Sequence, residues 1–474
     1  MAQWQPIAKI AEQVRSGEIQ AAQLVEDALD RIENNKEYKA IISIITKRAR
    51  ERAKYIDEQV RNGKNPGRLA GVPFIAKDNF LAFGAETTAA SNILKGFDAP
   101  YQASAIEKLE AEGAILVAKA NLDAFAHGSS TENSDFFTTL NPHDKSRVPG
   151  GSSGGSAVSV ILGMTPFAIG TDTGGSIRLP ASFTGIVGYK PTYGLISRSG
   201  VVAMASSTDV IGPLAANVDD IALIVDIISG HDPQDSTMIE RNEKAYTELD
   251  QEVRGKIIGV VKEYMGEGLH EDVRISIQTA IQSFENAGAV IKEVSLPSLP
   301  LALAVYYIIC PAEVSSNLSR YDGQRFGFSY PEAKNIDESY EISREKGFGA
   351  EAKRRIMIGT YVLSSGYYDA YYRKAQTVRT KLINEFNKAF EGVDFLLGPT
   401  APTTAFKIGQ NTDDPLKMYL TDIMTVAANL VGVPAISLPC GVSDGLPIGV
   451  QLIASQKHDR ELLSLAKAYE GMRV

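Results

Sequence analysis

Two glycine- and serine-rich clusters, separated by one short apolar segment, are the residues of this chain best suited to covalent chemistry. The first, GGSSGGS, covers residues 150–156, and the second, TDTGGS, covers residues 171–176. Glycine lets the backbone turn sharply and approach other atoms closely. Serines on such turns, with backbone N–H groups beside them, are typical of a nucleophile next to an oxyanion hole.

Three interpretations of these clusters follow from the residues. A P-loop needs a lysine after its second glycine, whereas Ser156 follows here, so a nucleotide-binding loop is disfavoured. The nucleophile-elbow pattern G-x-S-x-G matches residues 151–155 and would make Ser153 the nucleophile, but it should follow a strand and a polar loop precedes it. The third interpretation combines both clusters with Lys77, which ends the apolar run 71–76.

The combination of Lys77 with the two clusters resembles the catalytic set of the amidase signature family. The resemblance implies that Lys77 is the base, that Ser152 relays the proton from within a cis peptide, and that Ser176 is the nucleophile. The residues whose backbone N–H groups it implies for the oxyanion are Thr173, Gly174 and Gly175.

A lysine is a poor base at its ordinary pKa of ~10.4. To accept a proton near neutral pH it should titrate at roughly 7–8. Burial disfavours the charged form of a lysine, and Val72, Phe74, Ile75 and Ala76 are apolar neighbours of Lys77 in the sequence. We therefore expect desolvation to lower the pKa of Lys77.

Within this family the chain resembles the glutaminase subunits of tRNA-dependent amidotransferases. The stretches behind that narrower resemblance are residues 128–134, 363–372 and 432–440. It implies that glutamine is hydrolysed through an acyl-enzyme and that the ammonia is used by another subunit to convert glutamate on tRNA(Gln) to glutamine. Such an assembly is a ligase of protein biosynthesis with glutamine as the amido donor.

The same resemblance implies partners and substrate contacts. ATP binding, nucleotide binding and Mg²⁺ belong to the partner subunit, which also carries the tRNA, and we expect no cofactor or metal on this chain. Free glutamine presents an α-carboxylate, which suits the planar fork of an arginine, and an α-ammonium, which suits a carboxylate. The residues implied to bind glutamine are Tyr306, Arg355 and Asp422.

One stretch departs from this subgroup. Residues 121–127 carry Ala124 and His127 where the resemblance leads us to expect Glu and Met. The catalytic set is unaffected, but the packing of the loop beside the pocket should differ.

Other functions remain open from the sequence. His458 precedes Asp459 and could serve a Ser-His-Asp hydrolase. The chain could also be a free-standing amidase that acts on another small amide. A third possibility is a catalytically silent scaffold, which the intact Lys77, Ser152 and Ser176 disfavour.

The composition limits these choices. The chain has 474 residues, 48 Lys and Arg against 57 Asp and Glu, and thus a net charge of −9. An acidic surface does not favour direct binding of nucleic acid, so a partner should carry any RNA. No signal peptide is evident, two cysteines cannot form a disulfide framework, and the apolar run 301–312 is too short to span a bilayer. We therefore expect a cytoplasmic protein.

The pattern of apolar residues predicts an α/β fold. We expect a helical N-terminal segment in residues 1–65, with helices over 7–62, followed by one large amidase domain in residues 66–474; the resemblance implies a mixed sheet covered by helices. The predicted strands are 114–118, 166–170, 256–261, 289–294, 395–397 and 435–438. The predicted helices are 157–162, 271–287, two within 351–392, and 460–469.

Overall fold

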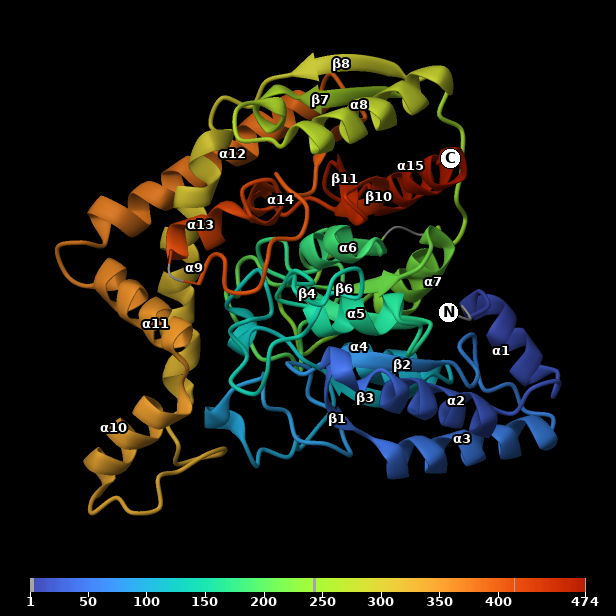
Figure 1. The fold of residues 1–474 in the computed structure, drawn as a ribbon, viewed down its shortest axis with the longest axis vertical. Coiled ribbons are helices and arrows are strands. Elements are labelled where there is room, and N and C mark those ends of the chain that lie inside the picture. Colours follow the sequence, from blue (N-terminus) through green and yellow to red (C-terminus); the bar gives the residue numbers. More distant parts are fainter. Residues whose placement is uncertain (1–3, 242–243, 413, 474) are drawn as a thin grey trace.

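A single mixed sheet organises the computed structural model, which describes residues 4–241, 244–412 and 414–473. Across the described residues it has 11 strands in the order β1-β3-β2-β4-β6-β5-β10-β11-β9-β7-β8 (Figure 1). The strands are β1 Ile41–Ile44, β2 Pro73–Lys77, β3 Ile115–Ala120, β4 Phe167–Asp172, β5 Val187–Lys190, β6 Val210–Ala215, β7 Ile257–Val261, β8 Val290–Val294, β9 Phe395–Pro399, β10 Ala435–Ser443 and β11 Leu446–Ala454.

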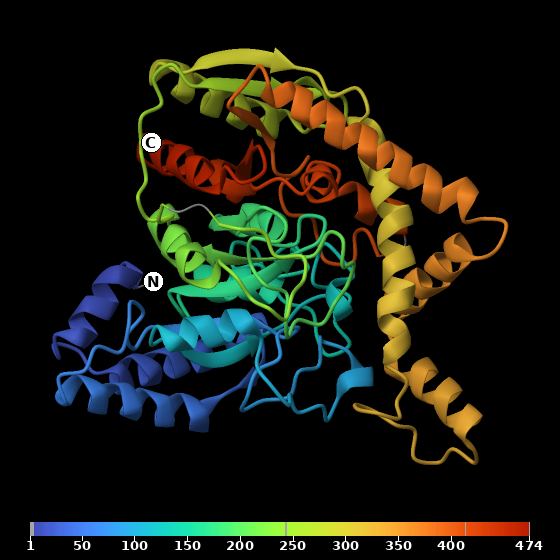
Figure 2. The ribbon, with the colours of Figure 1, turned by 180° about the vertical axis from the view of Figure 1, so that it is seen from behind.

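Helices cover both faces of this sheet. Helices α5 and α6 lie in front of it in Figure 1, whereas α4 and α7 lie in front of it in the reverse view of Figure 2. The α-helices are α1 Ile7–Arg15, α2 Ala21–Asn34, α3 Thr46–Arg61, α4 Ser104–Ala111, α5 Gly154–Ile161, α6 Arg178–Thr184, α7 Val218–Ile228, α8 Glu271–Asn286, α9 Ala302–Asn317, α10 Ile336–Gly347, α11 Ala350–Leu363, α12 Lys374–Phe390, α13 Pro415–Leu420, α14 Val426–Val431 and α15 Asp459–Met472. Short 3₁₀ segments cover Lys36–Tyr38, Asn92–Leu94, Ala124–Ala126, Lys262–Met265, Leu299–Leu301 and Leu318–Arg320, and a π-helical turn covers Asp369–Arg373.

The strand directions confirm the mixed sheet. β2 is parallel to both β3 and β4, and β7 is parallel to both β8 and β9. Parallel neighbours need a crossover, usually a helix, and α4 and α8 supply it for β2–β3 and β7–β8. The central strands are buried on both faces, which explains why they appear in the sequence as continuous apolar runs rather than alternating ones.

The N-terminal segment is only partly helical, which corrects the prediction for residues 7–62. Between α2 and α3, residues Ile41–Ile44 form β1, which pairs antiparallel with β3 at the edge of the sheet. Three of the four residues are isoleucine, a β-branched residue that packs well on a sheet. The segment therefore contributes a strand to the main sheet, and the proposed boundary at residues 65/66 stays a prediction.

The other predicted elements are found close to their expected positions. The predicted strands correspond to β3, β4, β7, β8, β9 and β10, and the predicted helices to α5, α8, α11, α12 and α15. The sequence pattern did not assign β5, β6 or β11, and it described β2 only as an apolar run that ends at Lys77.

Helices α9 to α12 stand along one side of the molecule (Figures 1 and 2). Among the described residues, the helical stretch Leu299–Arg320 is the one long and apolar enough to cross a membrane by length and composition, and half of its most apolar 18-residue window is buried in the fold. It is longer than the apolar run 301–312 because polar residues extend it at its C-terminal end. Its main helix, α9, contacts α11, α12 and α14, as expected of a core helix.

The topology brings the two clusters and the lysine together. β2 ends at Lys77 and the adjacent parallel strand β4 ends at Asp172. The carboxyl ends of parallel strands lie at the same edge of a sheet, so the loops that follow β2 and β4 are neighbours. Helix α5 begins inside the first cluster, at Gly154, and packs on β2 and β4, which places residues 150–155 at this edge.

Candidate active site

The ammonium group of Lys77 lies in the middle of the two clusters. The residue is fully buried, and its Nζ lies 2.7 Å from Ser152 Oγ, 2.9 Å from Ser153 Oγ and 2.9 Å from Thr171 Oγ1. Three hydroxyl groups therefore surround one amine. Sequence reasoning identified Ser152 but missed Ser153 and Thr171 as partners of Lys77.

The surroundings of Lys77 favour the neutral amine. Burial lowers the pKa of Lys77 to about 7, although the negative charges of Asp123, Asp172 and Asp209 act in the opposite direction. This agrees with the expectation that desolvation lowers its pKa into the range of a general base. A substantial fraction of Lys77 is therefore able to accept a proton at neutral pH.

The peptide bond between Gly151 and Ser152 is cis, as the family resemblance implies. This part of the backbone is tightly enclosed. A Cβ atom on Gly151 would lie 2.3 Å from Asp123 Oδ2, and one on Gly154 would lie 2.1 Å from Thr131 Oγ1. Such distances are too short for any side chain, so the glycines of the first cluster allow close packing against the loop 123–131.

Ser176 lies in the turn between β4 and α6. The N–H of Ser153 donates a hydrogen bond of 3.1 Å to the carbonyl oxygen of Ser176, which joins the two clusters. Ser176 is 8% exposed, and within the described part of the chain its hydroxyl makes no hydrogen bond. The structure thus brings Lys77, Ser152 and the Ser176 loop together and leaves the Ser176 hydroxyl available.

The turn before Ser176 presents unused backbone donors. Within residues 4–241, 244–412 and 414–473, the N–H groups of Thr173, Gly174 and Gly175 donate to no protein acceptor. The carboxylate of Asp172 holds the turn from behind because its Oδ2 accepts the N–H groups of Ile177 (3.1 Å) and Arg178 (3.3 Å). These free donors are what an oxyanion site requires.

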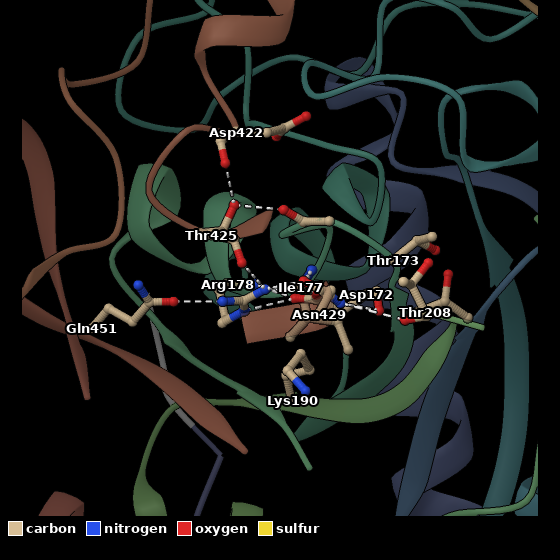
Figure 3. Close-up of polar contacts among 12 residues, drawn as sticks. Asp172, Thr173, Ile177, Arg178, Lys190, Thr208, Asp422, Thr425, Asn429 and Gln451 are labelled. Atoms are coloured by element: carbon tan, nitrogen blue, oxygen red, sulfur yellow. Dashed lines mark hydrogen bonds and ion pairs between the residues drawn. The ribbon is translucent and has the colours of Figure 1, made fainter. Parts of the chain in front are cut away.

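A buried ion pair supports this turn (Figure 3). Arg178 and Asp172 are both fully buried, and the Arg178 Nη2 to Asp172 Oδ1 distance is 2.9 Å. Asn429 Nδ2 donates to Asp172 Oδ1 (2.9 Å), and Arg178 Nη2 also donates to Asn429 Oδ1 (2.6 Å). Burial alone would raise the pKa of Asp172, but the charge and hydrogen bonds of Arg178, together with Lys190 and Asn429, outweigh it and lower that pKa to about 2. The carboxylate therefore stays ionised.

Arg355 and Asp422 meet at a second polar site. A cavity of about 60 Å³ is lined by residues including Ser129, Tyr307 and Arg355. The hydroxyls of Ser129 and Tyr307 donate to Asp422 Oδ2 at 2.7 and 3.3 Å. Burial raises the pKa of Asp422 to about 7. Arg355 thus lines this cavity, and Asp422 is bound by two other lining residues, Ser129 and Tyr307, which the sequence did not identify.

The guanidinium of Arg355 is held in place but has spare donors. It is 3% exposed, its Nε donates to Glu351 Oε1 at 2.9 Å, and it lies over the ring of Tyr307 at 5.4 Å. Its other hydrogen bond, among the described residues, is a long one from Nη1 to the Cys310 sulfur at 3.8 Å. Most of its donors are therefore available to a carboxylate.

Tyr306 connects this cavity to the Ser176 turn. Its ring lies against Gly174, where a Cβ atom would meet the Tyr306 hydroxyl at 2.8 Å. It also packs edge-to-face on Tyr307, with 5.1 Å between the ring centres. The two tyrosines therefore form a continuous wall from the loop of the candidate nucleophile to Asp422.

The divergent stretch, residues 121–127, belongs to a loop that is closed by Asp123. Its carboxylate accepts the N–H groups of Thr131 (2.9 Å) and Asn133 (3.0 Å). The side chain of His127 is fully buried, and neither ring nitrogen has a hydrogen-bond partner among the described residues. Burial lowers the pKa of His127 well below its ordinary value. The imidazole is thus buried in its neutral form at the position where Met was expected.

The two alternative catalytic arrangements find no support in the geometry. His458 is exposed and its Nδ1 lies 2.7 Å from Ser455 Oγ, while Asp459 binds Tyr189 and Thr192. No strand leads into Ser153 in the described chain, so the elbow pattern lacks its structural context. Among the described residues no group of three or more His, Cys, Asp or Glu side chains is placed to hold a metal.

Comparison with known proteins gives consistent results. The model of the family described as Amidase matches residues 23–463. The A subunit of glutamyl-tRNA(Gln) amidotransferase from Thermoanaerobacter pseudethanolicus is 50% identical over 466 residues, which are 98% of this chain and 95% of that protein. The protein of the same name from Staphylococcus haemolyticus is 46% identical over 469 residues, with 98% and 97% covered.

Solved structures resemble the chain over almost its whole length. The crystal structure of the A subunit of glutamyl-tRNA(Gln) amidotransferase from Thermotoga maritima has a TM-score of 0.80 and 40% identity, and the match covers 98% of this chain and 94% of that one. The peptide amidase from Stenotrophomonas maltophilia has a TM-score of 0.82 and 28% identity, with 98% and 96% covered. All these proteins share the fold described above.

Proposed function

Because the chain belongs to the amidase signature family, we propose that it is the glutaminase subunit of a tRNA-dependent amidotransferase. It hydrolyses glutamine and supplies ammonia for the conversion of Glu-tRNA(Gln) to Gln-tRNA(Gln). The observation that carries the proposal is the buried Lys77 amine, 2.7 Å from Ser152 Oγ, at the edge of the sheet where the Ser176 turn also lies. The names of its relatives at 46–50% identity support the choice of substrate and assembly.

The first half of the reaction forms an acyl-enzyme. Neutral Lys77 accepts the proton of the Ser152 hydroxyl, and Ser152 accepts the proton of Ser176 as its oxygen attacks the side-chain amide carbon of glutamine. The negative charge on the amide oxygen is bound by the backbone N–H groups of the Ser176 turn. The proton returns through Ser152 to the leaving nitrogen, the C–N bond breaks, and ammonia leaves.

The second half releases glutamate. A water molecule gives its proton through the same serine and lysine and attacks the ester carbon of the glutamyl-Ser176 intermediate. The ester bond breaks and Ser176 regains its proton. The residues proposed to bind the oxyanion in both halves are Thr173, Gly174 and Gly175. Losing one such donor typically costs about 10²–10³ in rate.

Arg355 and Asp422 recognise the amino-acid end of glutamine. The spare Arg355 donors bind the α-carboxylate, and Asp422, ionised, binds the α-ammonium. Tyr306, which lies between this cavity and Gly174, borders the path of the side chain that carries the amide. A charge-assisted hydrogen bond of this kind contributes about 1.5–3 kcal/mol.

The partners follow from charge and from the family. With a net charge of −9, the chain does not favour RNA, so another subunit holds the tRNA. ATP and Mg²⁺ act on that subunit, this chain needs no cofactor, and the assembly works in the cytoplasm without a membrane.

A free-standing amidase is the second candidate. Similar folds at 26–28% identity include an aryl acylamidase and a peptide amidase, so the fold itself does not select glutamine. Arg355 in the cavity wall, with Asp422 bound to the lining residues Ser129 and Tyr307, favours an amino-acid amide over a neutral one.

Ammonia release separates these functions. The purified chain is assayed alone and together with its partner subunits, first with glutamine and then with a simple aliphatic amide. The proposal predicts release from glutamine that increases with partners, ATP and Glu-tRNA(Gln), and formation of Gln-tRNA(Gln). Hydrolysis of the simple amide alone would establish the free-standing amidase, and no release from either would establish a silent scaffold.

A further inference from the structure

Thr425 joins the turn that carries Asp422 to the loop that carries Ser176 (Figure 3). The residue is fully buried. Its hydroxyl donates to the carbonyl oxygen of Gly174 at 2.6 Å and lies 3.1 Å from the carbonyl oxygen of Asp422. Its N–H donates to that same Asp422 oxygen at 3.0 Å, and its own carbonyl accepts from Arg178 Nη2 at 3.1 Å.

The bond to Gly174 determines where the next N–H group points. A peptide unit is planar, and in the trans form its C=O and N–H point in opposite directions. The hydroxyl of Thr425 holds the Gly174 carbonyl on one side, so the N–H of Gly175 is directed to the other side. This N–H is one of the donors without a partner among the described residues.

The close contact between Thr425 and the Gly174–Gly175 peptide restricts movement of that peptide. Gly175 has a φ of +142°, a backbone conformation that other residues rarely adopt, and a Cβ atom there would lie 2.2 Å from Thr425 Oγ1. The loop therefore rests directly on the Thr425 hydroxyl. A shift of Thr425 would turn the Gly174–Gly175 peptide and with it the free donor.

We infer that Thr425 is a positioning residue that aims the Gly175 N–H at the oxyanion and links it to the Asp422 turn. It touches neither substrate nor reacting atoms. The inference rests on the proposed function in that Ser176 is taken as the nucleophile and Gly175 as an oxyanion donor. The hydroxyl is the essential group, because the methyl group of Thr425 contributes nothing to the Gly174 hydrogen bond.

Substitution of Thr425 should therefore lower kcat more than it changes KM. Thr425→Val keeps the shape of the side chain and removes the donor, and we expect kcat to fall at least about tenfold with KM within about twofold of the wild type. Thr425→Ser restores the hydroxyl and should recover most of kcat. The matched control is Thr184→Val, which removes another buried hydroxyl, donating to the Pro180 carbonyl at 2.7 Å, and should keep both constants.

Two substrates distinguish two possible roles of Thr425: orienting the Gly175 N–H and supporting the position of Asp422. Glutaramic acid is glutamine without its α-amino group, so it does not use Asp422, yet its amide passes through the same oxyanion. Our inference predicts the same loss of kcat for Thr425→Val on both substrates. A loss confined to glutamine and expressed in KM would overturn it, as would an unchanged kcat.

The role of Thr425 can still be tested if glutamine is not the substrate. A wild-type enzyme that hydrolyses glutaramic acid but not glutamine would overturn the proposed function and would still report on Thr425 through kcat. Thermal unfolding of each variant verifies the fold. If Thr425→Val does not fold, Thr425→Ala, which needs no extra space, replaces it, and wild-type kcat in that variant would also overturn the inference.

Discussion

The Nζ atom of Lys77 lies 2.7 Å from Ser152 Oγ in a site from which solvent is excluded. This contact supports the proposed role of the lysine as a base. Burial favours its neutral form, and in the proposed mechanism the serine beside it carries the proton to and from the nucleophile. The charges of three nearby aspartates limit the fall in its pKa, so the amine titrates near neutral pH rather than far below it.

The rate should therefore depend on pH through Lys77. With a pKa of about 7, the amine is protonated and inactive below that pH and neutral above it. For glutaramic acid, whose binding does not use Asp422, we expect kcat/KM to rise tenfold per pH unit below about 7 and to level off above it. The measurement is ammonia release between pH 5 and 9. A profile that falls across this range would contradict the role of Lys77 as base.

Substitution of Lys77 tests whether this residue causes the predicted pH dependence. Lys77→Ala should lose activity at every pH, because within the described residues no other base contacts the Ser152 hydroxyl. His458→Ala is the matched control and should keep both the rate and its pH dependence, since this histidine is exposed and away from the clusters. The reverse result, an active Lys77→Ala and an inactive His458→Ala, would show a histidine mechanism.

Arg355 should determine preference for an α-carboxylate. Arg355→Ala removes a charge-assisted pair, so kcat/KM for glutamine should fall at least about tenfold, since ~1.4 kcal/mol corresponds to a factor of ten. 4-Aminobutanamide, which is glutamine without its carboxylate, should be affected much less. An equal loss on both amides would indicate that Arg355 only supports the fold. Lys353→Ala, which changes an exposed residue that does not line the cavity, serves as the control.

The Arg178–Asp172 pair should be important for stability. Arg178→Met leaves a carboxylate buried without its partner, which typically costs about 3–5 kcal/mol. Denaturant unfolding should show this loss. Arg373→Met removes an arginine from an ion pair that is 73–74% exposed, and it should have little effect. Equal stability of the two variants would contradict the structural role of the buried pair.

His127 should lower the stability of the protein. Its ring nitrogens are buried and have no hydrogen-bond partner among the described residues, and a buried polar group in this state costs about 1–3 kcal/mol. His127→Met should thus raise the free energy of unfolding, whereas His231→Met, at an exposed position, should not. Loss of stability on His127→Met would indicate that the imidazole makes an interaction that the protein needs.

The central constellation could be predicted because its parts are local motifs. GGSSGGS, TDTGGS and Lys77 at the end of an apolar run are each visible within ten residues, and the parallel pairing of β2 with β4 brings them together. The charged residues Arg355 and Asp422 could be predicted only through the family resemblance. Their spatial relationship came from the structure, because α11 and the turn after α13 are far apart in the sequence.

Other features could not be predicted because they depend on distant partners. Arg178 binds Asn429 and Gln451. The sequence around Arg178 gives no indication of these two partners. Tyr307 rather than Tyr306 donates to Asp422, because consecutive residues of α9 point in different directions. Strand β1 was missed because four residues between two helices give too short a pattern, and the strand is stabilised by its pairing with β3.

The most direct test of this account is ammonia release from glutamine by the Ser176→Ala variant. The substitution removes one hydroxyl that makes no hydrogen bond within the described residues, so the protein should fold as the wild type does. We predict that hydrolysis falls by at least about 10⁴-fold, as expected for loss of a nucleophile, and that Ser153→Ala retains measurable activity. Wild-type activity in Ser176→Ala, together with an inactive Ser153→Ala, would contradict the account and assign the nucleophile to the first cluster.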